Sequence, residues 1–151
     1  MISQLILINT AVFVLWIAIV DYKKYLIPNR LLQYCFLFNF TLIIFETRLE
    51  FKTYFEIVSY SLISFIFYLL LYFFSQKTFG LGDVKYSFVL SIPVAYLFDY
   101  RVVLDLHLLA FVIGGIWALW LLIFKKINKN HTIAFGPFMS LSYFLIIALN
   151  L

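Results

Sequence analysis

Long apolar runs separated by short polar segments make up most of this chain. Each run comes close to the roughly 20 residues that a helix needs to cross a bilayer. The pattern predicts six transmembrane helices, at about residues 2–20, 29–45, 57–74, 84–98, 106–124 and 133–151. The fourth is the weakest of these, because it is short and because Pro93 should kink it. We therefore expect an all-α fold, a polytopic membrane helix bundle formed by a single domain, residues 1–151.

The composition agrees with a membrane protein and indicates which class of partner its charged residues contact. Of the 151 residues, 66% are hydrophobic and 12% are charged, so a soluble domain of this size could not bury the apolar surface. The net charge of +4 comes from Lys and Arg residues scattered over short segments. Because they form no continuous basic face, we expect lipid head groups rather than nucleic acid as partners. The single cysteine, Cys35, excludes an internal disulfide.

The positive residues predict the orientation, because Lys and Arg are retained on the cytoplasmic side. The first, third and fifth connections hold eight of them: Lys23, Lys24, Arg30, Lys77, Lys85, Lys125, Lys126 and Lys129. The second and fourth connections hold three: Arg48, Lys52 and Arg101. We therefore expect a multi-pass protein of the inner or cytoplasmic membrane, with both termini outside.

The acidic residues single out two positions. Five of them fall in or beside the two outer connections: Glu46, Glu50, Glu56, Asp99 and Asp105. Only Asp21 and Asp83 lie on the inner side, where Asp21 follows the first span and Asp83 precedes the fourth. Ionisable residues at such positions are candidates for function, because hydrocarbon penalises charge. Helix packing could bring these two together although 62 positions separate them.

Two carboxyl groups that share a site do not both ionise readily, so one keeps a proton and the pair titrates as a unit. This arrangement is used by aspartic proteases, in which one carboxylate activates water and the other carboxyl group polarises the scissile carbonyl. The glycines Gly80 and Gly82 would let a substrate backbone approach Asp83 closely. The simpler interpretation is a flexible turn with Asp83 as a helix N-cap. We expect no metal and no cofactor, because two aspartates supply few ligands for a hard cation.

Three separated stretches together resemble the type IV prepilin peptidases, which are membrane aspartic proteases with a Gly-x-Gly-Asp motif. The first is Asp21 followed by Ile-Pro-Asn at residues 27–29. The second is Gly-Leu-Gly-Asp-Val-Lys at residues 80–85, and the third is Ala-Phe-Gly-Pro-Phe at residues 134–138. The resemblance implies that Asp21 and Asp83 are catalytic. It also implies that a further set of residues binds substrate or shapes the site: Gly80, Gly82, Lys85, Pro28, Asn29, Gly136 and Pro137.

The resemblance further implies a substrate and a partner. Such enzymes remove a short basic leader from type IV prepilins or prepilin-like proteins at the cytoplasmic membrane surface, typically just after a glycine that precedes a hydrophobic helix, in service of a pilus or a secretion apparatus. Larger members carry an N-terminal region with paired cysteines and methylate the new N-terminus. This sequence begins directly with a span, so we expect the short, peptidase-only form.

Two other interpretations remain open from the residues. A presenilin-like protease also uses Gly-x-Gly-Asp, but it expects a Tyr-Asp well inside a helix, whereas Asp21 leads into a charged segment. A non-catalytic membrane transport or assembly protein would use the two aspartates as caps or as a proton relay. That interpretation predicts that Asn at either position leaves function largely intact.

Overall fold

The computed structural model describes residues 2–47, 50–75, 79–124 and 133–150, and within these ranges its regular structure consists of six α-helices. They are α1 (Ile2–Lys24), α2 (Asn29–Thr47), α3 (Phe51–Phe74), α4 (Leu81–Leu97), α5 (Tyr100–Phe124) and α6 (Gly136–Asn150). The all-α prediction is confirmed. Each predicted span corresponds to one helix.

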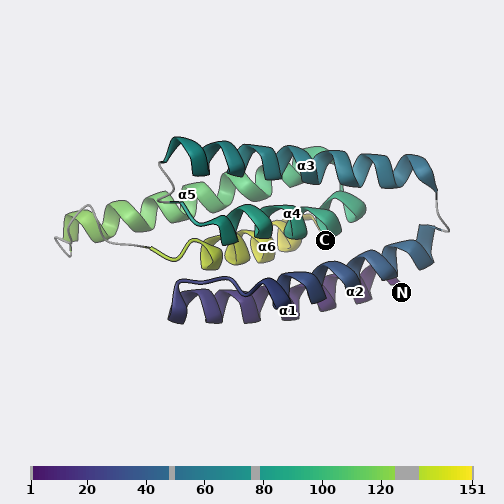
Figure 1. Cartoon of the computed structure of the whole chain (residues 1–151), viewed down its shortest axis with the longest axis horizontal. Helices are drawn as coiled ribbons and strands as arrows, with labels where there is room; N and C mark the ends of the chain where they lie inside the picture. Colours follow the sequence, from purple (N-terminus) through teal and green to yellow (C-terminus); the bar gives the residue numbers. More distant parts are fainter. Residues whose placement is uncertain (1, 48–49, 76–78, 125–132, 151) are drawn as a thin grey trace.

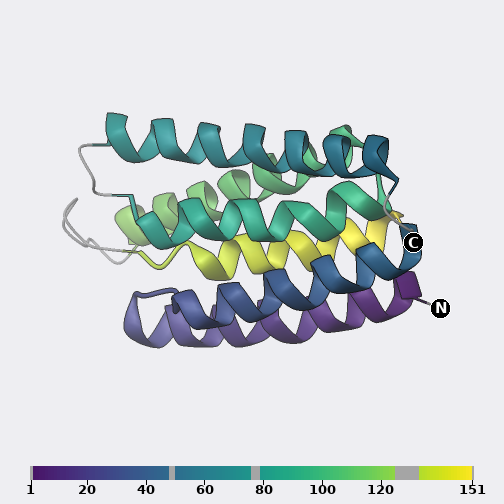
Figure 2. The same ribbon diagram turned by 45° about the vertical axis from the view of Figure 1, so that its right-hand side comes forward.

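Consecutive helices run in alternating directions and lie side by side along one common axis (Figures 1 and 2). The first residues of α1 and the last residues of α6 therefore lie at one end of the bundle, and the ends of α1, α3 and α5 lie at the other. The end that faces the cytoplasm stays a prediction from the charge distribution. Five of the positive residues behind that prediction lie outside the described residues: Arg48, Lys77, Lys125, Lys126 and Lys129.

Apolar side chains cover the outside of the bundle, and small polar side chains lie within it. Large residues such as Ile8, Phe45 and Leu108 are exposed, whereas Thr10 and Ser142 are fully buried. A membrane protein has this distribution, because lipid solvates apolar surface and small polar residues let helices approach closely. By length and composition, three of the described helices could cross a membrane, α1, α3 and α5, and α6 is a shorter apolar helix.

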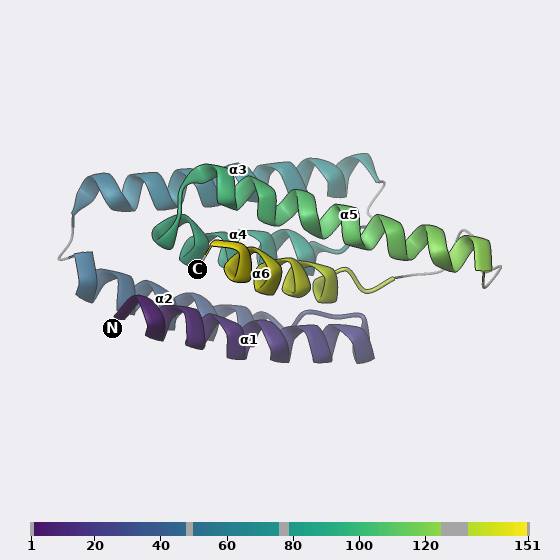
Figure 3. The same cartoon turned by 180° about the vertical axis from the view of Figure 1, so that it is seen from behind.

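Helix α4 occupies the centre of the bundle. It contacts each of the other five helices, and most of its residues are buried. Figure 1 shows it between α3 on one side and α1 and α2 on the other, and Figure 3 shows α6 beside it. The short fourth segment is thus the inner helix of the bundle. It does not face lipid along its length, so it can carry the buried Ser87 and Ser91.

Several helix boundaries differ from the predicted ones. Helices α3 and α5 each begin six residues earlier than predicted, because charged residues that lower hydropathy still fit the first turns of a helix. Helix α1 continues past Asp21 to Lys24, and α4 begins at Leu81. Helix α6 begins at Gly136, three residues later than predicted, with Pro137 in its first turn. A proline is favoured there because the first turn leaves its N–H groups without helical partners.

Candidate active site

The two predicted aspartates lie at the same end of the bundle. Asp21 is in the last turns of α1, and Asp83 is in the first turn of α4, ahead of the apolar segment 84–97. Both are buried, at 4% and 8% exposure, and both line one cavity of about 330 Å³. Other members of the predicted set line the same cavity: Asn29, Gly80, Gly82 and Lys85.

Asp21 is held by the start of α6. Its Oδ2 accepts a hydrogen bond of 2.9 Å from the backbone N–H of Gly136. A Cβ atom at residue 136 would lie 2.8 Å from the same oxygen, so only glycine permits this approach without displacing the carboxylate. A backbone N–H that donates to a carboxylate stabilises its ionised form. Gly136 therefore contacts the candidate catalytic group directly.

Asp83 has a different environment. Its Oδ1 is buried and has no hydrogen-bond partner among the described residues. Burial, and secondarily the negative charge of Asp21, raises the pKa of Asp83 to about 7, although backbone N–H groups of Gly80 and Asp83 act in the opposite direction. Burial penalises the charged carboxylate and a like charge nearby does the same. Asp83 is thus the member of the pair that favours the protonated state.

Gly80 is the N-cap residue of α4, and as a glycine it has no side chain that could form a capping hydrogen bond. The interpretation of Asp83 as the N-cap is therefore wrong, because Asp83 lies inside the first helical turn. A Cβ atom at residue 80 would lie 2.8 Å from Oδ2 of Asp83, so the missing side chain leaves space for the carboxyl group. The first glycine of the motif thus bears directly on the position of the aspartate.

The α1–α2 connection is fastened to the start of α4 at two points. A Cβ atom at Gly82 would lie 3.1 Å from Cβ of Ile27, so the two backbones approach closely. The ammonium group of Lys85 donates a hydrogen bond of 3.0 Å to Oδ1 of Asn29. These contacts explain why Ile-Pro-Asn and Gly-x-Gly-Asp-x-Lys occur in the same chain. They hold the two aspartate-bearing segments together.

Three residues of the predicted set do not line this cavity: Gly136, which binds Asp21, and the prolines Pro28 and Pro137. The carbonyl of Pro28 accepts hydrogen bonds from the N–H groups of Leu31 and Leu32, so Pro28 starts α2. Pro137 lines a neighbouring apolar cavity instead. The two prolines therefore belong to the local structure beside the candidate site and do not line it.

Tyr25 is a residue of the site that the sequence analysis missed. It lines the cavity, and its N–H donates a hydrogen bond of 2.7 Å to the carbonyl of Asp21. Its φ angle of 51° is the only positive one among the described non-glycine residues. Helices often end with a residue in this conformation, but glycine or asparagine is usual there. No pattern in the sequence predicted that a tyrosine would end α1 in this conformation and line the cavity.

The chemistry available to this arrangement is that of a carboxyl pair. Among the described residues, no group of three or more His, Cys, Asp and Glu side chains could hold a metal ion. The polar residues that line the cavity are Asp21 and Asp83, whose environments differ, together with Lys85, Asn29 and Tyr25, and the glycines Gly80 and Gly82 line it as well. Such a set can activate water, polarise a carbonyl and accept an extended peptide beside the glycines.

Comparison with known proteins gives one match. The model of the type IV leader peptidase family matches residues 8–119. The match includes Asp21, Asp83 and the whole Gly-x-Gly-Asp segment, and it ends before Gly136. No curated protein and no solved structure gave a match.

Proposed function

Because this chain belongs to the type IV leader peptidase family, and is therefore a peptidase, we propose that it is an aspartic endopeptidase that removes the short leader from prepilin-like proteins. Its site lies at the end of the helical bundle that the charge distribution assigns to the cytoplasm. A leader that has not entered the membrane would reach the two aspartates from that side of the inner or cytoplasmic membrane.

The observation that carries this proposal is the cavity shared by Asp21 and Asp83, in which the two carboxyl groups have unequal surroundings. Burial penalises the ionised form of both carboxyl groups, but the N–H of Gly136 opposes this at Asp21, whereas the charge of Asp21 adds to it at Asp83. A pair of carboxyl groups with separated protonation states supports an assignment of base and acid. Asp21 is the base in this proposal, and Asp83 is the acid.

The proposed reaction uses water without an acyl-enzyme. Asp21 takes a proton from water while the water oxygen attacks the scissile carbonyl carbon, and Asp83 gives its proton to the carbonyl oxygen. The tetrahedral diol then collapses as the C–N bond breaks. The leaving amine takes the proton held by Asp21, and one diol hydroxyl returns a proton to Asp83. Both carboxyl groups finish in their starting states.

The other groups of the cavity position the peptide. Gly80 leaves space for the Asp83 carboxyl group, and Gly82 lets Ile27 approach, so both glycines shape the wall on which the peptide would lie. The ammonium group of Lys85, fixed by Asn29, offers a donor at the exposed rim for a backbone carbonyl of the leader. Attack, proton donation and departure all require accurate positions of the reacting atoms, and misplacement by about 1 Å can cost 10²-fold in rate.

Co-expression of the protein with a panel of prepilin-like substrates tests this proposal. We expect leader loss, seen as a gel shift and a mass change, with wild type but not with Asp21→Asn or Asp83→Asn at matched abundance. The product mass also shows whether the new N-terminus is methylated, and we expect that it is not. Cleavage by either variant at the wild-type rate would contradict the aspartic mechanism.

A further inference from the structure

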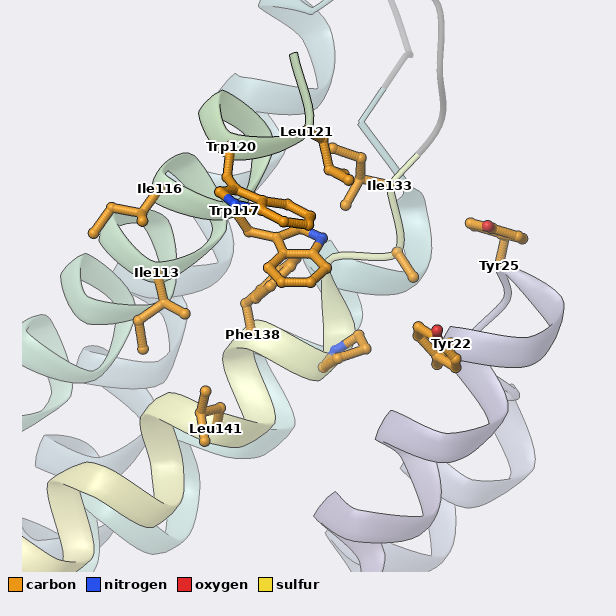
Figure 4. A pocket seen from close by; sticks show the side chains of 12 residues that line it. Tyr22, Tyr25, Ile113, Ile116, Trp117, Trp120, Leu121, Ile133, Phe138 and Leu141 are labelled. Atoms are coloured by element: carbon orange, nitrogen blue, oxygen red, sulfur yellow. The ribbon is translucent and has the colours of Figure 1, made fainter. Parts of the chain in front are cut away.

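A second cavity, of about 710 Å³, lies beside the candidate active site. Figure 4 shows it between the end of α1 and the last turns of α5, with the first turns of α6 beneath. We call it the apolar groove and define it by Tyr22 of α1, by Ile113, Ile116 and Trp117 of α5, and by Phe138 and Leu141 of α6.

The lining of the apolar groove selects an apolar occupant. None of the described residues that line it carries a charge. Trp117 and Trp120 stack on one wall with ring centroids 5.2 Å apart, and Tyr22 and Tyr25 lie on the opposite wall (Figure 4). Trp117 is 46% exposed, so its ring offers contact area to a partner. Aromatic side chains supply large contact area at low conformational cost.

The apolar groove and the aspartate cavity are neighbours, and Tyr25 lines both. A second link is the start of α6, where Gly136 binds Asp21 and the next residue, Pro137, lines the groove. A peptide bound at the aspartates therefore has the apolar groove as its neighbouring surface on the side of Tyr25.

The groove has the length of a helix segment. Its α5 wall extends from Ile113 to Leu121, which is about 12 Å along the axis at roughly 1.5 Å per residue. This length accepts about two turns of a helix lying alongside α5. Helix-in-groove recognition uses apolar anchors at i, i+3, i+4 and i+7, which such a length accommodates.

We propose that the apolar groove binds the first two turns of the apolar helix that follows the scissile bond of the substrate. This inference rests on the proposed function. The leader then lies over Gly80 and Lys85, the scissile bond lies at the two aspartates, and the apolar segment enters the groove past Tyr25. A lipid acyl chain is the alternative occupant, but the position of the groove directly beside the aspartate cavity favours a peptide.

Two synthetic peptides test the groove in detergent-solubilised, full-length protein. Both carry the same lysine-rich leader ending in glycine. The long peptide continues into a twenty-residue apolar helix, and the short one ends a few polar residues after the cleavage site. We expect Ile116→Trp, which fills the groove from a residue that is 64% exposed, to lower kcat/KM at least about tenfold for the long peptide. The short peptide should be cut as by wild type.

Leu119→Trp is the matched control, because Leu119 lies on the same helix, is 59% exposed and does not line the groove. It should cleave both peptides as wild type does. Leu141→Trp, from α6, is a second blocking variant and should reproduce the selective loss. Losses that are equal for the two peptides, or no loss in either blocking variant, would overturn the groove assignment while the peptidase function stands.

Photo-crosslinking locates the occupant independently. A benzophenone placed five residues after the scissile bond of the long peptide should crosslink to α5 and α6 residues of the groove in Asp83→Asn protein. Crosslinks to another face of the bundle, or to lipid alone, would overturn the proposal. Failure of wild type to cut either peptide would instead overturn the proposed function, and the groove assignment with it.

Discussion

Gly136 shows how closely a single backbone position controls the candidate site. Its N–H binds Asp21, and a Cβ atom there would lie 2.8 Å from the Asp21 carboxylate. We predict that Gly136→Ala lowers kcat about 10²-fold, because the displaced carboxylate no longer aligns with the attacking water. Kinetics of leader cleavage by purified protein measure this. The backbone itself should tolerate alanine, since no described glycine has a positive φ.

Gly115→Ala is the control for that prediction. A Cβ atom at Gly115 meets nothing within 4 Å, so this variant should keep the wild-type rate and the wild-type thermal stability. Gly136→Ala should also remain folded. Equal rates for the two alanine variants would show that the contact between Gly136 and Asp21 has no part in catalysis.

The protonation of Asp83 predicts a pH dependence. Its pKa is raised to about 7 by burial and by the charge of Asp21, so it stays protonated through the acid range and loses its proton as the pH rises through about 7. We expect kcat/KM to fall about tenfold per pH unit above that value, because the proposed acid is then lost. A protonated-carboxyl infrared band, absent in Asp83→Asn, should titrate in the same range.

The variant Asp21→Asn tests the direction in which the charge of Asp21 shifts the pKa of Asp83. The variant removes the negative charge that raises the pKa of Asp83, so the infrared midpoint should move to lower pH. Burial still raises the pKa, and the midpoint should stay above that of an ordinary aspartate. An unchanged midpoint would mean that the two carboxyl groups do not interact.

At the scale of residues, the sequence allowed prediction of the two aspartates and the glycines around Asp83, because charge is rare in this chain and its sidedness can be counted. Gly136 was predicted only as part of the site, since a backbone hydrogen bond across 115 positions leaves no local signal. Tyr25 could not be predicted, because its role depends on a backbone angle and on two cavities that meet beside it.

At the scale of elements, hydropathy predicted all six helices but not the central position of α4. Hydropathy measures suitability for lipid, whereas α4 is surrounded by the other five helices and needs no apolar outer face. Its place in the bundle is fixed by long-range contacts, such as the hydrogen bond of 2.9 Å between Tyr86 of α4 and Ser140 of α6. A pattern along the chain does not encode such contacts.

The α1–α2 pair depends on a buried polar contact at Asn39. The Asn39 Oδ1 atom accepts hydrogen bonds from Asn9 at 3.0 Å and from Thr10 at 3.2 Å, and both donors are on α1. We predict that Asn39→Ala lowers the free energy of unfolding by about 1–2 kcal/mol, as expected for two interhelical bonds in a membrane protein. Unfolding in mixed detergent measures the loss.

Thr41→Ala is the matched control on the same helix. Thr41 is exposed and its hydroxyl bonds only to the carbonyl of Leu37 within α2, so its removal should leave the unfolding free energy within about 0.5 kcal/mol of wild type. If both variants unfolded like wild type, the polar contact between α1 and α2 would contribute nothing to stability.

At the scale of the whole molecule, the alternating helices place three distant segments at one end of the bundle (Figure 2). The order of spans and the count of positive residues were enough to predict that Asp21 and Asp83 share this end, whereas Gly136 was assigned to the site through the resemblance. The contacts in which they meet were not predictable, because they depend on glycines that let α6 and the α1–α2 connection approach. The site is thus a product of topology and of the close approaches at Gly82 and Gly136.

The most direct test of the account is the kinetics of leader cleavage by purified Asp21→Asn, Asp83→Asn and the double variant, each with wild-type thermal stability. Groups that act as one unit give non-additive losses. We predict that each single variant loses about 10²- to 10⁴-fold in kcat, and that the double variant loses no more than the worse single one. Near-wild-type turnover in either single variant, or losses that multiply in the double variant, would contradict a catalytic aspartate pair.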